Sequence, residues 1–158
     1  MRSFCIVCSF VLLGCHLLAQ QHDPDAIQEM NDRYERTQAE RIAGRENEPA
    51  GEVFRNMRID WLKSVPARQL LGIMNGGYAR ALGVRCTYCH VEQDFASDEK
   101  RPKRAAREMA LMHWNINQAL AKMENLETPS EERFINCATC HRGRRDPRDG
   151  APGQDSNR

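Results

Sequence analysis

The sequence predicts one small all-α domain, and three observations carry that prediction. Apolar residues recur at spacings of three and four along the longest candidate helices, which places them on one helix face. Prolines and capping residues mark where these helices begin. No run of alternating apolar and polar residues, the pattern of a half-buried strand, occurs in the chain. The length of 158 residues suits a single domain.

Composition narrows the classes of partner. The 23 lysines and arginines balance 22 aspartates and glutamates, which gives a formal net charge of +1. Such a chain lacks the broad positive field that attracts nucleic acid, so we expect no nucleic-acid partner. Aromatic residues make up 6% of the chain, which is low for a domain stabilised by side-chain packing alone. We therefore expect a non-protein group to fill part of the core.

The N-terminus is typical of an export signal. A positive start is followed by an apolar stretch up to Ala19, shorter than the roughly 20 residues that cross a bilayer. Cleavage after Ala19 would remove residues 1–19 as a signal peptide. Alternatively, Leu12-Leu13-Gly14-Cys15 resembles a bacterial lipobox, in which case residues 1–14 are removed and Cys15 is lipidated. The sequence thus predicts an exported protein, either periplasmic or held at a membrane through Cys15.

Residues 20–60 are predicted to form a charged helical segment and a linker. Asp23 can cap a helix that has Pro24 at its first position and runs to about Ala43. Because its apolar stripe is thin, we expect a surface helix that is loosely attached. The stripe consists of Ile27, Met30 and Tyr34. The linker follows at 44–51.

A second helix is predicted over 64–83, with Ser64 as its cap and Gly83 as its stop. One face carries Leu70, Met74, Tyr78 and Ala81. Three internal glycines each cost about 1 kcal/mol relative to alanine. A helix tolerates that cost where something flat and bulky must approach its backbone. From periodicity alone, however, the pattern favours Met74 as an ordinary core residue.

The C-terminal half is predicted to contain one long and one short helix. A polar loop at 94–100 leads to Pro102, which begins a helix that extends to about Leu126. Its apolar side carries Ala105, Met109, Met112, His113, Ile116, Leu120 and Met123. Residues 128–132 cap a short helix, and residues 146–158, which lack an apolar period, are expected to form a disordered tail.

Four of the seven cysteines lie in two copies of one five-residue pattern, Cys-x-x-Cys-His, at 86–90 and 137–141. This pattern is the attachment site of c-type haem. Two thiols three positions apart form thioethers with the two vinyl groups of one porphyrin, and the histidine that follows is the proximal ligand of the iron. The sequence therefore predicts two covalently attached haem c groups. The first is held by Cys86, Cys89 and His90, and the second by Cys137, Cys140 and His141.

Paired cysteines also occur in zinc sites, redox motifs and disulfides. A zinc site usually has about 15–20 residues between its pairs, whereas 47 residues separate Cys89 from Cys137. A thioredoxin-like motif needs a βαβ context, which the sequence does not predict. A disulfide across two intervening residues closes a very small loop and leaves both histidines without a role. Haem attachment is the interpretation that uses every residue of the pattern.

Each iron needs a sixth ligand or keeps an open position. Methionine raises the potential and suits electron transfer, whereas an open position favours gas or peroxide chemistry. Met74 precedes Cys86 by twelve residues, so a helix followed by a turn at Gly83 can bring it alongside the first haem. For the second haem the pattern leaves Met109, Met112 and His113 open, because all three lie on one helix.

The stretches 81–90 and 94–100, and 106–112 leading to 137–143, resemble the cytochrome c subunit of bacterial photosynthetic reaction centres. The resemblance covers about residues 61–145. It implies a multihaem cytochrome c fold in which helix–turn–CxxCH units pack around the haems. It also implies Met74 as distal ligand of the first haem and Met109 as that of the second, with Met112 in packing. Full-length members carry four haems, so this chain resembles a short, dihaem relative.

These inferences predict a dihaem domain at 61–145 that is an electron carrier and not an enzyme. Its expected partners are redox proteins, either a reaction centre or another membrane or periplasmic electron-transfer protein. The alternative is a small haem peroxidase or a gas or redox sensor with an open distal position. The candidates to pair with haem propionates are Arg104, Arg107 and Arg142, which are otherwise solvated surface arginines. Tyr88 is either at a haem edge or an exposed turn residue.

Overall fold

The computed structural model describes residues 23–149, and every regular element in that range is helical. Its elements are α2 (Pro24–Arg41), α3 (Ala50–Val53), α4 (Asp60–Lys63), α5 (Ala67–Gly72), the π-helix η1 (Ile73–Ala79), α6 (Arg80–Leu82), α7 (Cys86–Cys89), α8 (Arg101–Ala121), the 3₁₀-helix η2 (Ser130–Glu132) and α9 (Cys137–His141). The all-α prediction is confirmed. The expected signal peptide, Cys15 and residues 150–158 of the expected tail lie outside the described residues.

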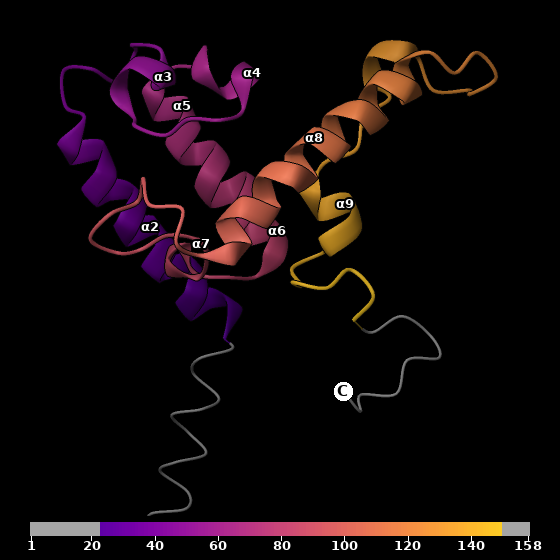
Figure 1. Cartoon of the computed structure of the whole chain (residues 1–158). Coiled ribbons are helices and arrows are strands. Elements are labelled where there is room, and N and C mark those ends of the chain that lie inside the picture. Colours follow the sequence, from indigo (N-terminus) through magenta and orange to yellow (C-terminus); the bar gives the residue numbers. More distant parts are fainter. Residues whose placement is uncertain (1–22, 150–158) are drawn as a thin grey trace, which may run out of the picture.

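The helices form a packed body and a projecting arm (Figure 1). Helices α2 to α7 gather around the beginning of α8, and α8 then runs away from them. Helix α9, which contains the second Cys-x-x-Cys-His pattern (called a frame below), lies beside the middle of α8. The turn η2 lies near the far end of α8. The two Cys-x-x-Cys-His frames therefore occupy different surroundings, one inside the body and one beside the arm.

The core lies under the first half of α8. One cluster of buried apolar residues joins α3, α4 and α5 to α8, and it consists of Ala50, Ile59, Leu62, Leu70 and Ala110. Trp61 stacks on Trp114 at the edge of this cluster, with ring centroids 5.0 Å apart. A second cluster, Ile42, Ala67 and Leu71, attaches the end of α2. These contacts hold α8 as far as Trp114, and the last part of that helix projects.

The N-terminal helix begins as predicted but is not loosely attached. The Asp23 side chain accepts from the backbone N–H of Asp25 at 3.0 Å, and Pro24 occupies the first position. Asn31, in the second turn, has no solvent exposure at all. A fully buried polar side chain is stable only when its hydrogen bonds are satisfied, so α2 belongs to the packed body.

The second predicted helix differs from expectation in its start and its middle. Ser64 ends α4, and the helix begins at Ala67 after Pro66, which has extended backbone angles. Its middle, Ile73–Ala79, is a π-helix in which the backbone N–H of Arg80 bonds to the carbonyl of Asn75. The predicted stop is confirmed, because Gly83 has φ +63° in the left-handed region.

The long helix is shorter at its C-terminus than predicted. It ends at Ala121, and the guanidinium of Arg133 then bonds to the carbonyls of Met123, Leu126 and Thr128. These side-chain bonds satisfy carbonyls of the segment that follows the helix. The predicted short helix is the single 3₁₀ turn η2. Within residues 23–149, no helix has both the length and the apolar character needed to cross a membrane.

Candidate functional site

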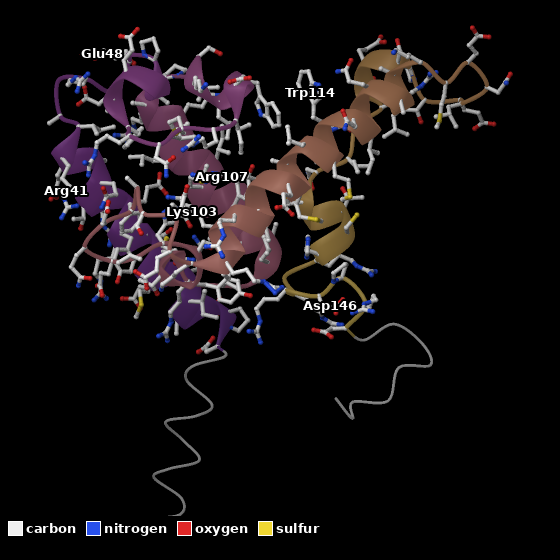
Figure 2. The ribbon with its side chains drawn as sticks, in the orientation of Figure 1. Arg41, Glu48, Lys103, Arg107, Trp114 and Asp146 are labelled. Carbon is white, nitrogen blue, oxygen red and sulfur yellow. The ribbon has the colours of Figure 1, made fainter. Side chains whose placement is uncertain are left out.

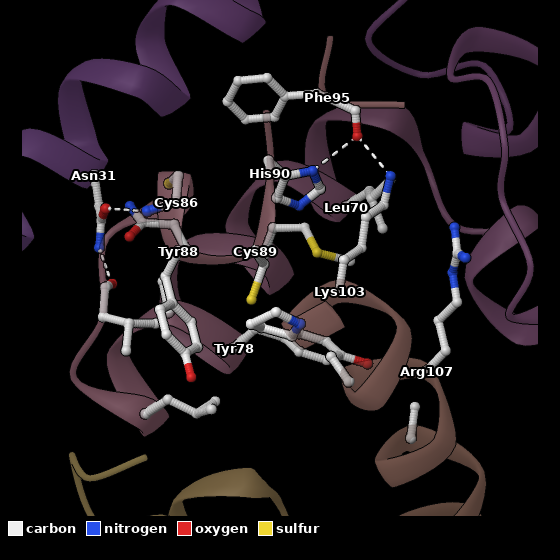
Figure 3. Close-up of a pocket in the computed structure, with 18 of the residues that line it drawn as sticks. Asn31, Leu70, Tyr78, Cys86, Tyr88, Cys89, His90, Phe95, Lys103 and Arg107 are labelled. Carbon is white, nitrogen blue, oxygen red and sulfur yellow. Dashed lines mark hydrogen bonds between the residues drawn. The ribbon is translucent and has the colours of Figure 1, made fainter. Parts of the chain in front are cut away.

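The first frame forms one helical turn, α7, that ends at its histidine. The backbone N–H of His90 bonds to the carbonyl of Cys86 at 3.0 Å. A turn of helix puts residues three apart on the same side, so the thiols of Cys86 and Cys89 both face one cavity (Figure 3). Burial raises the pKa of both thiols, that of Cys86 to about 11. Both are therefore neutral thiols at pH 7.

His90 is oriented for metal binding by its own loop. Its Nδ1 lies 2.8 Å from the carbonyl oxygen of Phe95, and because a carbonyl can only accept, Nδ1 donates. The imidazole stacks on the Phe95 ring with centroids 4.8 Å apart. Burial lowers the pKa of His90, which favours the neutral ring that a metal ligand requires. Nε2 is left available for metal coordination.

The cavity in front of His90 has a volume of about 900 Å³, at the upper end of the range for ligand pockets. Met74, Tyr78, Cys86, Cys89 and His90 all contribute to its wall. Burial raises the pKa of Tyr78 to about 12, so its hydroxyl stays protonated. The two thiols, the free imidazole nitrogen and the thioether of Met74 line one largely apolar space. That donor set fits a covalently attached haem.

Met74 enters this cavity from the π-helix η1. The π turn was not predicted, although helices of this kind occur frequently at functional sites. Gly76 and Gly77 lie within it, and a Cβ on Gly76 would meet nothing within 4 Å. Both glycines are exposed and neither lines the cavity, so the predicted close approach of a flat group to their backbone is not seen on this wall.

Asn31 is a site residue that the sequence did not reveal. Its Nδ2 donates to the carbonyl of Val84 and its Oδ1 accepts from the backbone N–H of Cys86, both at 2.9 Å. The Asn31 side chain on α2 thereby caps the start of the frame helix α7 (Figure 3). The signal that could have found it is its place four residues after Ile27 on the apolar stripe, combined with the low helix propensity of asparagine.

A second buried amide joins α2 to the helix that carries Met74. Asn75, which is 6% exposed, donates to Asp32 Oδ1 at 2.8 Å and to Glu35 Oε2 at 2.6 Å, and accepts from Gln28 Nε2 at 3.1 Å. The hydrogen bond from Asn75 is the largest cause that lowers the pKa of Asp32. Helix α2 therefore holds both walls of the first site, next to Met74 and at Cys86.

The second frame repeats the local geometry of the first. Helix α9 opens with a capping box between Asn136 and Thr139, both bonds being 3.1 Å long. The Nδ1 of His141 donates to the carbonyl of Arg144 at 3.0 Å. Burial raises the pKa of Cys137, whereas Cys140 is exposed. As in the first frame, Nε2 of the histidine is left free, but the residues of this frame are more exposed.

Of the three candidates for the second distal ligand, Met109 lies on the cavity wall together with Cys137 and His141. Met109 is 41% exposed. Met112 and His113 do not line the cavity. The structure thus brings together Met109, Cys137 and His141, while Cys140 lies outside that wall.

His113 contacts the chain that leads into the second frame. Its Nε2 lies 2.7 Å from the carbonyl oxygen of Ile135 and donates to it. One turn later, Asn117 bonds both backbone groups of Ile135, accepting from its N–H at 2.7 Å and donating to its carbonyl at 3.0 Å. Together these side chains fix the segment just before Cys137.

The two frames meet at a glycine contact. The backbone N–H of Gly143 donates to the carbonyl of Ala81 at 2.8 Å, and a Cβ on Gly83 would lie 2.1 Å from the Gly143 oxygen. Both glycines have positive φ. A second contact places the guanidinium of Arg145 5.7 Å from the centre of the Tyr88 ring. Tyr88 also lines the cavity.

The three predicted propionate partners have different settings. Arg107 lines the cavity and makes a 2.8 Å ion pair with Asp98. Arg104 donates to the carbonyls of Asp98 and Glu99 and lies outside the cavity wall. Arg142 is the exposed C-cap of α9. Figure 2 labels Arg107 and Lys103 on the part of α8 nearest the packed body.

The two frames do not combine into one metal centre. Within the part of the chain that the structure describes, no three histidine, cysteine, aspartate or glutamate side chains gather as a metal ion would require.

Comparison with known proteins decides the family. The pattern of the family described as photosynthetic reaction centre cytochrome C subunit matches residues 12–152. The chain belongs to this family. The resemblance predicted for 61–145 is confirmed, and the family is one of electron-transfer cytochromes with covalently bound haem c and redox partners.

The chain is similar in sequence to two named cytochromes. The chain is 33% identical over 86 residues to cytochrome c-554 of Chloroflexus aurantiacus, and the matched segment covers 54% of this chain and 20% of that protein. It is 35% identical over 83 residues to the photosynthetic reaction center cytochrome c subunit of Rubrivivax gelatinosus, which covers 47% of this chain and 23% of that protein. The match spans about a fifth of the length of each relative. No solved structure matches the chain significantly.

Proposed function

We propose that this protein is a dihaem c-type cytochrome that passes single electrons between redox proteins. The observation that carries the proposal is the cavity of about 900 Å³ whose wall includes both frame histidines, His90 and His141, and two methionines, Met74 and Met109. Bound haem supplies a reversible one-electron change at iron. The chain supplies attachment, axial ligands and a largely apolar cavity.

At the first site, Cys86 and Cys89 attach the haem, His90 is the proximal ligand and Met74 the distal one. The bond from His90 Nδ1 to the Phe95 carbonyl fixes the ring so that Nε2 faces the cavity. Such an outer partner sets both the orientation and the basicity of a ligating imidazole. A thioether opposite a histidine raises the potential, which suits an electron carrier.

At the second site, Cys137 and Cys140 attach the haem, His141 is proximal and Met109 distal. A haem held there would cover apolar side chains of α8 that the protein alone leaves exposed. Met109 and Met112 are 41% and 45% exposed, and apolar surface of this kind gains stability when it is covered. His113 is occupied with the Ile135 carbonyl, which favours Met109 as the ligand.

We further propose that the protein is exported and works as an electron carrier, not as an enzyme. It would lie in the periplasm after removal of residues 1–19, or at a membrane through lipidated Cys15. Its partners would be redox proteins, with a reaction centre among the candidates because the family is named for that complex.

The test is a count of covalent haems in protein made in a bacterial host that attaches haem c. Denatured protein should carry two additional haem masses by mass spectrometry. Replacing both cysteines of either frame by alanine should remove one haem mass and leave the other, so each frame variant controls for its partner. A native protein without added mass, or with one, would contradict the dihaem proposal.

The alternative function, a peroxidase or a gas or redox sensor, is favoured by the exposure of Met109 and Cys140. An open distal position binds cyanide and carbon monoxide, whereas a methionine-ligated iron shows a thioether-to-iron charge-transfer band instead. We expect that band from both haems and no rapid change on adding either ligand. High-spin signals from the second haem would support the alternative.

A further inference from the structure

The carbonyl oxygen of Phe95 accepts two hydrogen bonds. One comes from Nδ1 of His90 at 2.8 Å and the other from the ammonium of Lys103 at 2.7 Å. Both are drawn in Figure 3, where the two donors approach the same oxygen. A carbonyl has two lone pairs, so the proximal histidine and Lys103 share this one acceptor.

The ammonium is held firmly in this place. Its side chain is 11% exposed, and Nζ also donates to the carbonyl of Ser97 at 2.8 Å and lies 3.6 Å from Asp98 Oδ1. Lys103 belongs to the first turn of α8, whereas Phe95 and Ser97 belong to the loop after the frame. The start of the long helix thus delivers a fixed positive charge to the back of the proximal ligand and to the cavity wall.

The second frame lacks this arrangement. His141 Nδ1 donates to the carbonyl of Arg144 at 3.0 Å. Among residues 23–149, no other side-chain donor has a hydrogen bond to that carbonyl. In both frames a backbone carbonyl accepts from the histidine Nδ1. Only in the first frame does a lysine ammonium also donate to that carbonyl.

We propose that Lys103 raises the reduction potential of the first haem by competing for the Phe95 carbonyl and by placing a cation beside the site. This inference rests on the proposed function, in which His90 is the proximal ligand. A strong bond from Nδ1 makes the imidazole more electron-donating, which stabilises the oxidised iron. Sharing the acceptor weakens that effect. Reduction transfers one electron from the partner to the iron, Fe(III) to Fe(II), and a nearby cation favours the less positive product.

The experiment is a redox titration of the intact dihaem protein and its Lys103→Met variant. At a fixed applied potential near the midpoint, the ratio of reduced to oxidised first haem should fall about tenfold, equivalent to 59 mV for one electron. The second haem should be unchanged and serves as an internal reference. The matched control is Lys63→Met, which removes the same charge from α4, where Lys63 pairs with Asp60 outside the cavity.

A second variant separates the two causes and covers a failure to fold. Lys103→Gln removes the charge but keeps an N–H donor, so its first haem should fall in potential by less than in Lys103→Met. In the Met variant, exchange of the His90 ring N–H with solvent should also slow, because its acceptor is no longer shared. An unchanged potential in both variants, or an equal change in Lys63→Met, would overturn this proposal. Absence of a haem at the first frame of the unaltered protein would instead overturn the proposed function.

Discussion

The two frame sites share their local geometry and differ in what surrounds them. At the first, buried amides of Asn31 and Asn75 tie α2 to the frame and to the methionine helix. At the second, the supporting contacts are His113 and Asn117 on one side of a short segment. In both frames the five residues form the turn, and a carbonyl three to five residues beyond the histidine, that of Phe95 or Arg144, orients its ring. The walls of the site come from elsewhere in the chain.

The same contrast appears in exposure. The first site lies against a core of buried apolar residues, whereas the arm that carries the second leaves large apolar side chains in contact with water. Phe134, just before the second frame, is 68% exposed, and Leu126 is 42% exposed. Burying such groups contributes about 25 cal/mol per Å². We therefore expect the second site to depend more strongly than the first on its haem for a stable structure.

The largest loss of unfolding free energy should come from disrupting the Gly83–Gly143 contact between the two sites. Gly83→Ala puts a methyl group 2.1 Å from the Gly143 oxygen, at a residue with φ +63°. Left-handed backbone and forced overpacking together cost about 2–5 kcal/mol. Chemical denaturation of the haem-loaded protein measures this loss of unfolding free energy, and the visible spectra of both haems should change.

A matched control separates strain from collision. Gly44 also has positive φ, +83°, but a Cβ there meets nothing within 4 Å. Gly44→Ala should therefore cost only about 1–2 kcal/mol and leave both spectra intact. Equal losses in the two variants would show that the Gly83–Gly143 contact does not hold the frames together.

An intermediate effect, confined to one site, is expected from Asn31→Ala. The change leaves the Val84 carbonyl and the Cys86 N–H without their partner, at a cost of about 1–3 kcal/mol. The first haem should shift in potential and spectrum while the second stays unchanged. Asn47→Ala, at an exposed position, is the control and should alter stability by less than about 0.5 kcal/mol. Equal shifts at both haems would mean that α2 supports the molecule as a whole.

The sequence predicted the parts of each site that are local in the chain. Both frames, the left-handed turn at Gly83 and the capped start at Asp23 follow from short-range chemistry that any copy of those residues would obey. Asn31 was missed because its partners lie 53 and 55 residues away, and no periodicity reports such a contact. The same reason hid the role of His113, whose partner is 22 residues away.

Two features of the backbone were also beyond the sequence. The π-helix around Met74 contains Gly76 and Gly77, and neither these residues nor the apolar spacing distinguishes it from an α-helix in the sequence. The pattern favoured continuing α8 to Leu126, whereas the segment after Ala121 is held by Arg133, which donates to carbonyls at 123, 126 and 128.

The smallest effect on the molecule as a whole should come from replacing Met109, the proposed distal ligand of the second haem. Met109→Ala removes the thioether that shares a cavity wall with His141, so the second haem should become high-spin while the first keeps its spectrum. His113→Ala is the comparison variant, because His113 is the other strong ligand type on the same helix. Its loss should instead remove one of the two donors to the Ile135 carbonyl and speed amide exchange at 134–136, with the haem spectrum unchanged. If the spectrum follows His113 and ignores Met109, the second site uses two histidines, which lowers its potential. The two frames would then differ in iron ligation as well as in their surroundings.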